Sequence, residues 1–195
     1  MDEPLERAVN SLAAGDLIVY PTETVYGLGA DALDPVAIEQ VFAAKGRDRE
    51  KPLSMAVPDV ERALEYTAPT ERERRFMGTF LPGPVTVLLE RRSVVPDALV
   101  GGRDRVGIRI PDHELALALL SRFAPITATS ANRSGRGSVR RLDELDPALR
   151  SRVAVTLDGG ETDGTESTVV DVEANRIVRR GALTEEIEIW LRENP

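Results

Sequence analysis

The chain has 195 residues, of which 42% are hydrophobic and 30% are charged, a composition typical of a soluble globular protein with a buried core. It contains no cysteine and one histidine, His113, which excludes disulfides, thiolate nucleophiles and zinc sites built from several histidines. The net charge of −8 disfavours non-specific nucleic-acid binding, and the acidic N-terminus and lack of an apolar run of about 20 residues predict a cytoplasmic protein without a membrane segment.

The first half of the chain is predicted to alternate between helices and strands. Residues 3–14 have helical hydrophobic spacing, and the apolar run 16–20 predicts a buried strand. A helix over 36–45 is ended by Gly46, so Lys45 is expected in its last turn. The other elements expected here are a strand at 53–57, helices at 60–66 and 71–80, and strands at 84–90 and 106–110.

The second half continues the alternation. Asp112 is expected to cap a helix over 114–123, and Thr184 is expected to cap a closing helix that contains Trp190. Between them we expect a strand at 126–129, a loop at 130–141, a short helix within 142–150, and strands at 153–157, 168–172 and 177–179. Several strands are joined by connections too short for a helix, so the pattern predicts one α/β domain, residues 1–195, with a mixed sheet flanked by helices.

Polar and basic clusters follow several of the predicted strands, at the positions where open α/β sheets bind ligands. The clusters are PTETVYGLGADA at 21–32, KGR at 45–47 with Arg49 and Lys51, Arg109, TSANRSG at 129–135, EST at 166–168, and Arg179 with Arg180. Their hydroxyl groups suit a small polar ligand and their cations suit phosphates. The sequence has no GxxxxGK[ST] loop, so the clusters predict a nucleotide site of another construction.

Two further features are assigned structural roles. The glycine pair in Gly27-Leu28-Gly29 is too little for a dinucleotide fingerprint and is expected to form a tight turn. His113 follows Asp112 at a helix start, where a capping or surface role is expected rather than a catalytic one.

The two lysines of the chain lie six residues apart. Among 25 basic residues only Lys45 and Lys51 are lysines, and the rest are arginines. Taken alone, this charged segment is most simply a solvated surface. In the company of the other clusters, the compact ammonium of Lys45 suits a phosphate oxygen at close range, whereas Lys51 is expected on the surface.

Six motifs, in chain order, carry a family resemblance. They are PTETVYGLGADA at 21–32, KGR at 45–47 with PL at 52–53, LPGPVT at 81–86, VGIRIP at 106–111, TSANRSG at 129–135, and ESTVVD at 166–171 with RRG at 179–181. Together they resemble the YrdC-like family, whose best-known members are threonylcarbamoyl-AMP synthases of tRNA modification. The resemblance covers about residues 12–183. It implies a single domain with a twisted mixed sheet and a positively charged concave face, in the short form without a further C-terminal domain.

The resemblance also implies an activity and its residues. ATP, L-threonine and bicarbonate would give threonylcarbamoyl-AMP and pyrophosphate. A downstream threonylcarbamoyl transferase would then use the threonylcarbamoyl-AMP to modify tRNA at adenosine 37. No protein nucleophile is needed, and Mg²⁺ would arrive with ATP rather than in a protein metal site. The implied catalytic residues are Lys45, Arg47, Ser130 and Asn132; further ATP contacts are Arg49, Ser138 and Arg180; threonine contacts are Thr22, Arg109, Thr129 and Ser167.

Two alternatives stay open at this point. Some YrdC-like proteins bind double-stranded RNA or ribosomes without an established synthase activity. The arginines of the loop at 130–141 give that alternative its contact surface; they are Arg133, Arg136, Arg140 and Arg141. A related domain also occurs in carbamoyl-transfer enzymes of hydrogenase maturation, although normally within a much longer chain.

Overall fold

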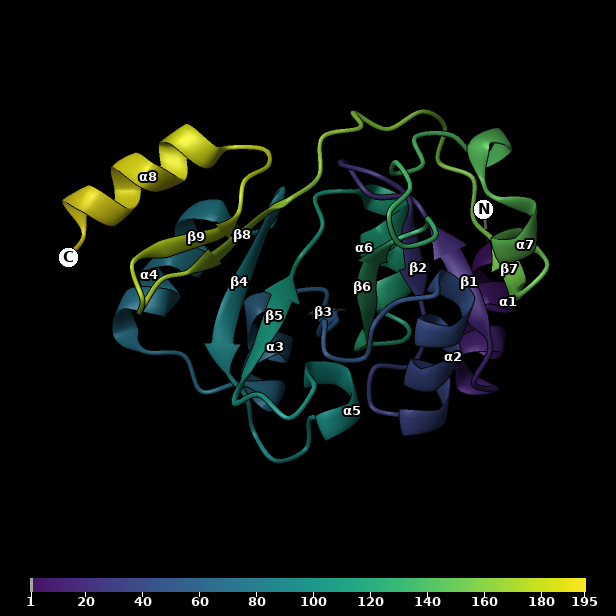
Figure 1. The fold of residues 1–195 in the computed structure, drawn as a ribbon, viewed down its shortest axis with the longest axis horizontal. Helices are drawn as coiled ribbons and strands as arrows, with labels where there is room; N and C mark the ends of the chain where they lie inside the picture. Colours follow the sequence, from purple (N-terminus) through teal and green to yellow (C-terminus); the bar gives the residue numbers. More distant parts are fainter. Residues whose placement is uncertain (1) are drawn as a thin grey trace.

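A nine-stranded mixed sheet forms the centre of the structure, a computed structural model that describes residues 2–195. Its strands are β1 (Leu17–Tyr20), β2 (Gly27–Gly29), β3 (Ser54–Ala56), β4 (Val85–Glu90), β5 (Arg105–Arg109), β6 (Ile126–Ser130), β7 (Val153–Thr156), β8 (Thr168–Asp171) and β9 (Arg176–Arg179). Their order is β7-β1-β2-β6-β3-β5-β4-β8-β9 (Figure 1), with the pairs β7–β1, β3–β5 and β4–β8 parallel and the others antiparallel. The predicted α/β fold with a mixed sheet flanked by helices is confirmed.

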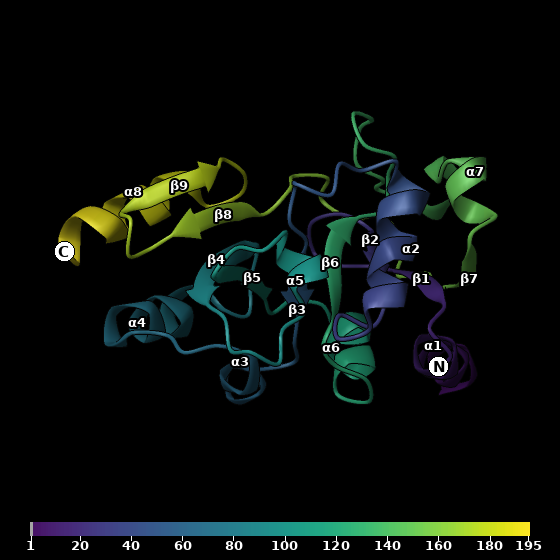
Figure 2. The same cartoon turned by 60° about the horizontal axis from the view of Figure 1, so that its bottom comes forward.

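Helices pack on this sheet through two hydrophobic cores. They are α1 (Asp2–Ala13), α2 (Pro35–Lys45), α3 (Val60–Tyr66), α4 (Glu71–Phe80), α5 (Asp97–Val100), α6 (Glu114–Leu120), α7 (Pro147–Arg150) and α8 (Thr184–Glu193), with a 3₁₀ turn at Leu142–Glu144. Helices α1 and α6 contribute to the smaller core, and α2, α4 and α8 to the larger one. Figure 2 shows α3 and α4 beneath β4 and β5. Within residues 2–195 no helix has both the length and the apolarity needed to cross a membrane.

Strand β1 shows why a continuous apolar run forms a strand here. All four of its residues are buried. Because successive side chains of a strand point to opposite faces, Leu17 and Val19 enter the larger core, whereas Ile18 and Tyr20 enter the smaller one. Burial on both faces requires the unbroken apolar sequence that predicted this strand.

The glycine pair after β1 does not form the expected tight turn. Residues Gly27–Gly29 form β2, which pairs antiparallel with both β1 and β6. A Cβ atom at Gly27 would lie 2.8 Å from Cζ of Tyr20, and one at Gly29 would lie 3.1 Å from its Cε1. The glycines are therefore needed because the Tyr20 ring lies against this strand, a tertiary contact that local turn preferences do not register.

Two expected helix caps are also corrected. Helix α6 begins after His113 instead of Asp112, and His113 makes no side-chain capping bond. Helix α8 begins after Leu183, whose φ of 58° is left-handed. The hydroxyl of Thr184 lies inside the helix, where it donates to the carbonyl oxygen of Gly181 at 2.8 Å and accepts from its N–H at 3.0 Å. Thr184 therefore closes the turn before the helix.

Candidate functional site

A cleft of about 930 Å³ opens on one face of the sheet. Its floor includes Ala128, Ser54, Gly107 and Leu88, which lie in register across β6, β3, β5 and β4. A Cβ atom at Gly107 would clash with the Ser54 hydroxyl and lie 3.0 Å from Cγ2 of Thr86. Small side chains thus keep the floor open at the middle of the sheet.

The cleft gathers most of the residues that the sequence nominated. Eight of the eleven line it: Thr22, Lys45, Arg47, Arg109, Thr129, Ser130, Asn132 and Ser167. They come from the loop after β1, the end of α2, β5, β6 with its following loop, and the start of β8. As predicted for an α/β sheet, these polar groups converge from separate strand ends.

Lys45 joins the end of α2 to the loop after β6. Its side chain is buried, and Nζ donates to the carbonyl oxygens of Ser130 and Asn132, the latter at 2.7 Å. It also lies 3.3 Å from Oδ1 of Asn132, which accepts a 2.5 Å hydrogen bond from the Ser130 hydroxyl. The predicted lysine and the predicted Ser-x-Asn motif therefore form one network. Lys51, expected on the surface, is exposed and stands at the rim of the cleft.

The cations Lys45, Arg47 and Arg179 stand close enough to affect the pKa values of one another. Burial, and then the charge of Arg47, lower the pKa of Lys45 from 10.5 to about 7. Burial, and then the charge of Arg179, lower the pKa of Arg47. Like charges held together in a partly buried site favour an anionic ligand, which would also favour the protonated form of Lys45.

Arg179, which the sequence placed in a basic cluster with Arg180 but did not nominate as a site residue, lines the cleft. Its guanidinium donates to the backbone oxygen of Ser167 at 2.7 Å and to its hydroxyl at 2.9 Å. It also forms a 3.0 Å ion pair with Glu166, whose other oxygen accepts a 2.5 Å hydrogen bond from Ser138. The nominated Ser138 does not line the cleft, but Glu166 links it to Arg179.

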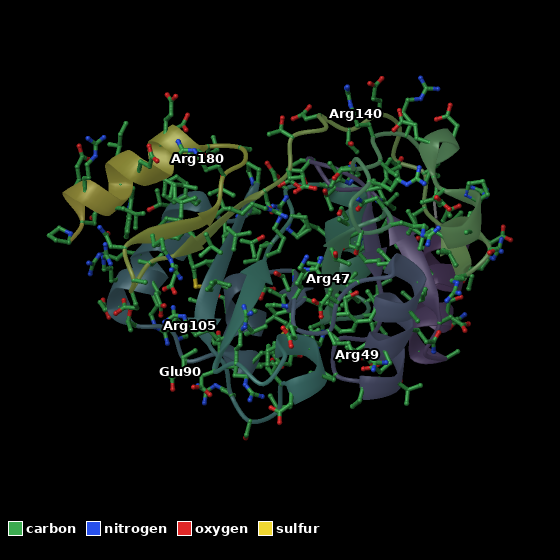
Figure 3. All side chains as sticks on the ribbon, viewed as in Figure 1. Arg47, Arg49, Glu90, Arg105, Arg140 and Arg180 are labelled. Atoms are coloured by element: carbon green, nitrogen blue, oxygen red, sulfur yellow. The ribbon has the colours of Figure 1, made fainter. Side chains whose placement is uncertain are left out.

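Two nominated arginines lie outside the cleft. Arg49 pairs with Glu39 at 2.5 Å, and Arg180 pairs with Glu188 at 2.6 Å; the two arginines are largely exposed and the two glutamates are partly exposed. Figure 3 shows Arg47 near the centre of the view, between the two halves of the molecule, with Arg180 beside α8 and Arg49 by α2. Arg179 is the last residue of β9 and lines the cleft, whereas Arg180 lies just beyond the strand and turns to Glu188.

Arg109 is the centre of a second group of nominated residues in the cleft. This residue is 5% exposed, and its Nη2 donates to Glu23 Oε1 at 2.8 Å and to Thr24 Oγ1 at 3.2 Å. Burial lowers the pKa of Arg109, and the negative charge of Glu23 counteracts this. Beside it, the hydroxyls of Thr86 and Ser167 lie 3.1 Å apart. A cation surrounded by hydroxyl groups suits a small polar carboxylate.

The donor set of the cleft does not favour a protein-held metal. Among residues 2–195, no three carboxylate or histidine side chains group in a way that could hold an ion. The carboxylates lining the cleft are Asp104, Glu166 and Asp171, and they stand among arginines.

The arginine loop offers less free charge than its sequence suggests. Arg140 pairs with Glu161 at 2.7 Å, and Arg141 pairs with Asp143 at 3.1 Å. Arg136 is one of the residues that line the cleft. These contacts reduce the positive surface available for a nucleic-acid backbone.

Comparison with known proteins gives consistent matches. The family model Sua5_yciO_yrdC, described as telomere recombination, matches residues 10–181. The chain is 41% identical over 169 residues to the threonylcarbamoyl-AMP synthase of Pyrococcus abyssi, covering 85% of this chain and 49% of that protein. It is 37% identical to the threonylcarbamoyl-AMP synthase of Bacillus subtilis, covering 95% of this chain and 55% of that protein.

A solved structure agrees with these sequence matches. The crystal structure of P. abyssi Sua5 complexed with L-threonine superposes with a TM-score of 0.89 at 38% identity, covering 95% of this chain and 56% of that one. The chain thus spans about half the length of these relatives.

Proposed function

Because the chain belongs to the Sua5/YciO/YrdC family, we propose that it is an L-threonylcarbamoyladenylate synthase, which converts ATP, L-threonine and bicarbonate to threonylcarbamoyl-AMP and pyrophosphate. One observation carries the proposal: a single cleft joins a cluster of cations to a buried arginine among hydroxyl groups. The first suits a triphosphate and the second suits an amino acid. A synthase needs both ligands side by side.

The cation cluster is assigned to ATP. Lys45, Arg47 and Arg179 all line the cleft, and the charge of Arg47 acts on Lys45 while that of Arg179 acts on Arg47. The loop after β6 adds the hydroxyl of Ser130 and the amide of Asn132. Charge develops on phosphoryl oxygens as pyrophosphate leaves, so positive groups already fixed in place stabilise the transition state without reorganising. Lys45 has a further task, because its ammonium also holds the backbone of the loop.

Arg109 is assigned to the carboxylate of threonine, and Thr22, Thr129 and Ser167, which line the same cleft, are assigned to the rest of that ligand. The amine of threonine would capture CO₂ derived from bicarbonate, and the resulting N-carboxylate would attack the α-phosphorus of ATP. No protein side chain forms a covalent bond in this sequence of steps. The chain contributes position and charge, which fits a site without cysteine and without a histidine in the cleft.

The remaining assignments follow from this proposal. Mg²⁺ would enter bound to the triphosphate, since the cleft offers carboxylates that are already surrounded by arginines. The product would pass, in the cytoplasm, to a transferase that modifies adenosine 37 of tRNA. Residues 1–195 would act as one domain.

The test is pyrophosphate release from MgATP, with L-threonine and bicarbonate each omitted in turn, at low and at molar salt. We expect release that requires both. Absence of release at either salt, from protein shown to be folded, would contradict the synthase assignment. Binding of double-stranded RNA that weakens steeply with salt would then favour the nucleic-acid alternative.

A further inference from the structure

Glu23 and Arg109 form an ion pair in which two charged groups keep unused hydrogen-bonding capacity. The pair has one contact, from Arg109 Nη2 to Glu23 Oε1 at 2.8 Å. The other carboxylate oxygen, Oε2, and the guanidinium Nε are both buried and have no hydrogen-bond partner among residues 2–195. A buried ion pair with imperfect hydrogen bonding is a poor source of stability, because desolvation offsets most of the attraction. Its position at the cleft therefore calls for a functional reason.

The two members of the pair differ in their relation to the cleft. Arg109 lines the cleft, whereas Glu23 contacts Arg109 without lining the cleft, and its side chain is 18% exposed. Both influence the buried Tyr20, whose pKa is raised mainly by burial, so that neighbour is neutral. The charge of Arg179 acts on Arg109 more weakly than that of Glu23. Glu23 is thus the negative charge that balances the positive charge of Arg109.

This balance discriminates between two kinds of carboxylate. A simple carboxylic acid bound to Arg109 would bring an uncompensated negative charge close to Glu23 in a buried, weakly screened site. An α-amino acid carries its ammonium on the carbon next to the carboxylate, so it adds no net charge. The ammonium is attracted by Glu23 while the carboxylate is attracted by Arg109.

We propose that Glu23 makes the amino-acid end of the cleft selective for zwitterions over simple carboxylates. This inference rests on the proposed function, because it takes Arg109 as the partner of the substrate carboxylate. Glu23 acts through its charge and through the orientation of the Arg109 guanidinium, so it is a selectivity residue rather than a catalytic one. It lies within PTETV, where its neighbours offer hydroxyl groups that cannot supply this charge.

The test compares the affinities of two proteins for two ligands, as in a double-mutant cycle. Isothermal titration calorimetry, without ATP, gives the affinities of wild type and Glu23→Gln for L-threonine and for 2,3-dihydroxybutanoate of the same configuration. The second ligand replaces the ammonium with a hydroxyl group. We expect the wild type to favour threonine by at least about tenfold and the isosteric variant to lose most of this ratio. A general loss of packing would weaken both ligands and leave the ratio unchanged.

The control is Glu65→Gln, which removes a carboxylate paired with Arg62 at 3.1 Å on the exposed surface of α3. It should keep the wild-type ratio. If Glu23→Gln does not fold, Glu23→Asp replaces it, since the shorter side chain withdraws the charge and should lower the ratio by a smaller amount. Equal wild-type affinities, or an unchanged ratio in the folded variant, would overturn the inference.

The two proposals fail in different ways. Pyrophosphate release that depends on threonine, combined with an unchanged ratio in Glu23→Gln, would remove the role of Glu23 and leave the synthase assignment intact. A wild-type protein that binds neither ligand and releases no pyrophosphate would remove both.

Discussion

The ammonium of Lys45 donates a 2.7 Å hydrogen bond to the backbone carbonyl oxygen of Asn132, 87 residues further along the chain. The last turn of a helix and a loop after a strand are thereby fixed to each other at the proposed phosphate site. Lysine suits this contact because its three donors can serve backbone oxygens and still present positive charge to the cleft.

Replacing Lys45 with alanine should reduce the rate of pyrophosphate release by at least about 100-fold, as for other fixed donors to a developing anion. The carbonyl oxygens of Ser130 and Asn132 would also lose a donor, at a cost of about 1–3 kcal/mol for each that stays buried. Turnover and urea unfolding measure the two effects. Near-normal turnover by Lys45→Ala would show that the phosphate site lies elsewhere.

ATP binding should depend on pH through Lys45. Its pKa of about 7 means that the free protein above pH 7 carries a largely neutral amine, which must take up a proton to hold phosphate oxygens. The association constant should therefore fall between pH 7 and pH 9, by up to about tenfold per unit. Lys45→Arg, which stays protonated, should lack this trend. Calorimetry at several pH values makes the comparison, and parallel curves for the two proteins would contradict it.

The same pKa has a consequence for stability. Between pH 7 and the ordinary lysine pKa of 10.5, the unfolded chain binds a proton at this position that the folded protein does not. The contribution of Lys45 to the free energy of unfolding should therefore rise with pH across that interval and be constant below it. Denaturant unfolding of wild type and Lys45→Met over this range isolates the contribution as a difference.

Arg109→Lys should raise the KM for threonine by about 10- to 100-fold, since a hydrogen bond to a charged group contributes about 1.5–3 kcal/mol. Lysine keeps the charge that balances Glu23 but not the planar fork that grips a carboxylate. The affinity for ATP, measured separately, should change little. An equal loss for both ligands would mean that Arg109 supports the whole cleft and does not serve threonine in particular.

The two neighbouring arginines at the end of the sheet should differ in their effect. Arg179→Ala should weaken ATP binding by about tenfold or more, because its guanidinium faces the cleft and bonds Ser167. Arg180→Ala removes an exposed pair with Glu188, an interaction that typically contributes under 1 kcal/mol, and should leave ATP binding near wild type. The reverse order would restore the assignment made from the sequence.

A methyl group at Gly107 should obstruct the floor of the cleft. The clash with Ser54 predicts that Gly107→Ala lowers the affinity for threonine or ATP by at least about tenfold. Gly78→Ala is the matched control, because a Cβ there meets no atom within 4 Å and alanine should stabilise helix α4 by about 0.5–1 kcal/mol. Comparable effects of the two substitutions on affinity would contradict the role of Gly107.

Local sequence signals predicted much of the fold and most of the cleft. The stop at Gly46 placed Lys45 at a helix end, and the strand-end position of Ser130 and Asn132 placed them near a ligand. What local signals could not provide was the contact between these segments, since burial of Lys45 depends on a loop that is remote in sequence. The strand at Gly27 was missed for the same reason, because the ring of Tyr20 determines it.

Other differences between prediction and structure concern residues whose surroundings depend on how the strands are arranged in the sheet. Arg179 and Arg180 have equivalent side chains in the sequence, and only the folded chain shows that Arg179, at the end of β9, lines the cleft while Arg180, just beyond the strand, pairs with Glu188. Glu23 was grouped with the polar residues of its motif, and its partner Arg109 became visible only once β5 was placed beside it.

The network around Lys45 also constrains how this protein can vary in length. Asp34 caps the start of α2, and Gly46 ends it in a left-handed conformation, so the helix is held at both ends with Lys45 in a fixed rotational phase. One inserted residue would turn Lys45 by about 100° around the axis and shift it by about 1.5 Å. The ammonium would then leave Ser130 and Asn132, and the buried apolar residues on one side of the insertion would turn away from the core. The length of α2, eleven residues, is therefore fixed by the need to hold Lys45 against the loop of the proposed phosphate site.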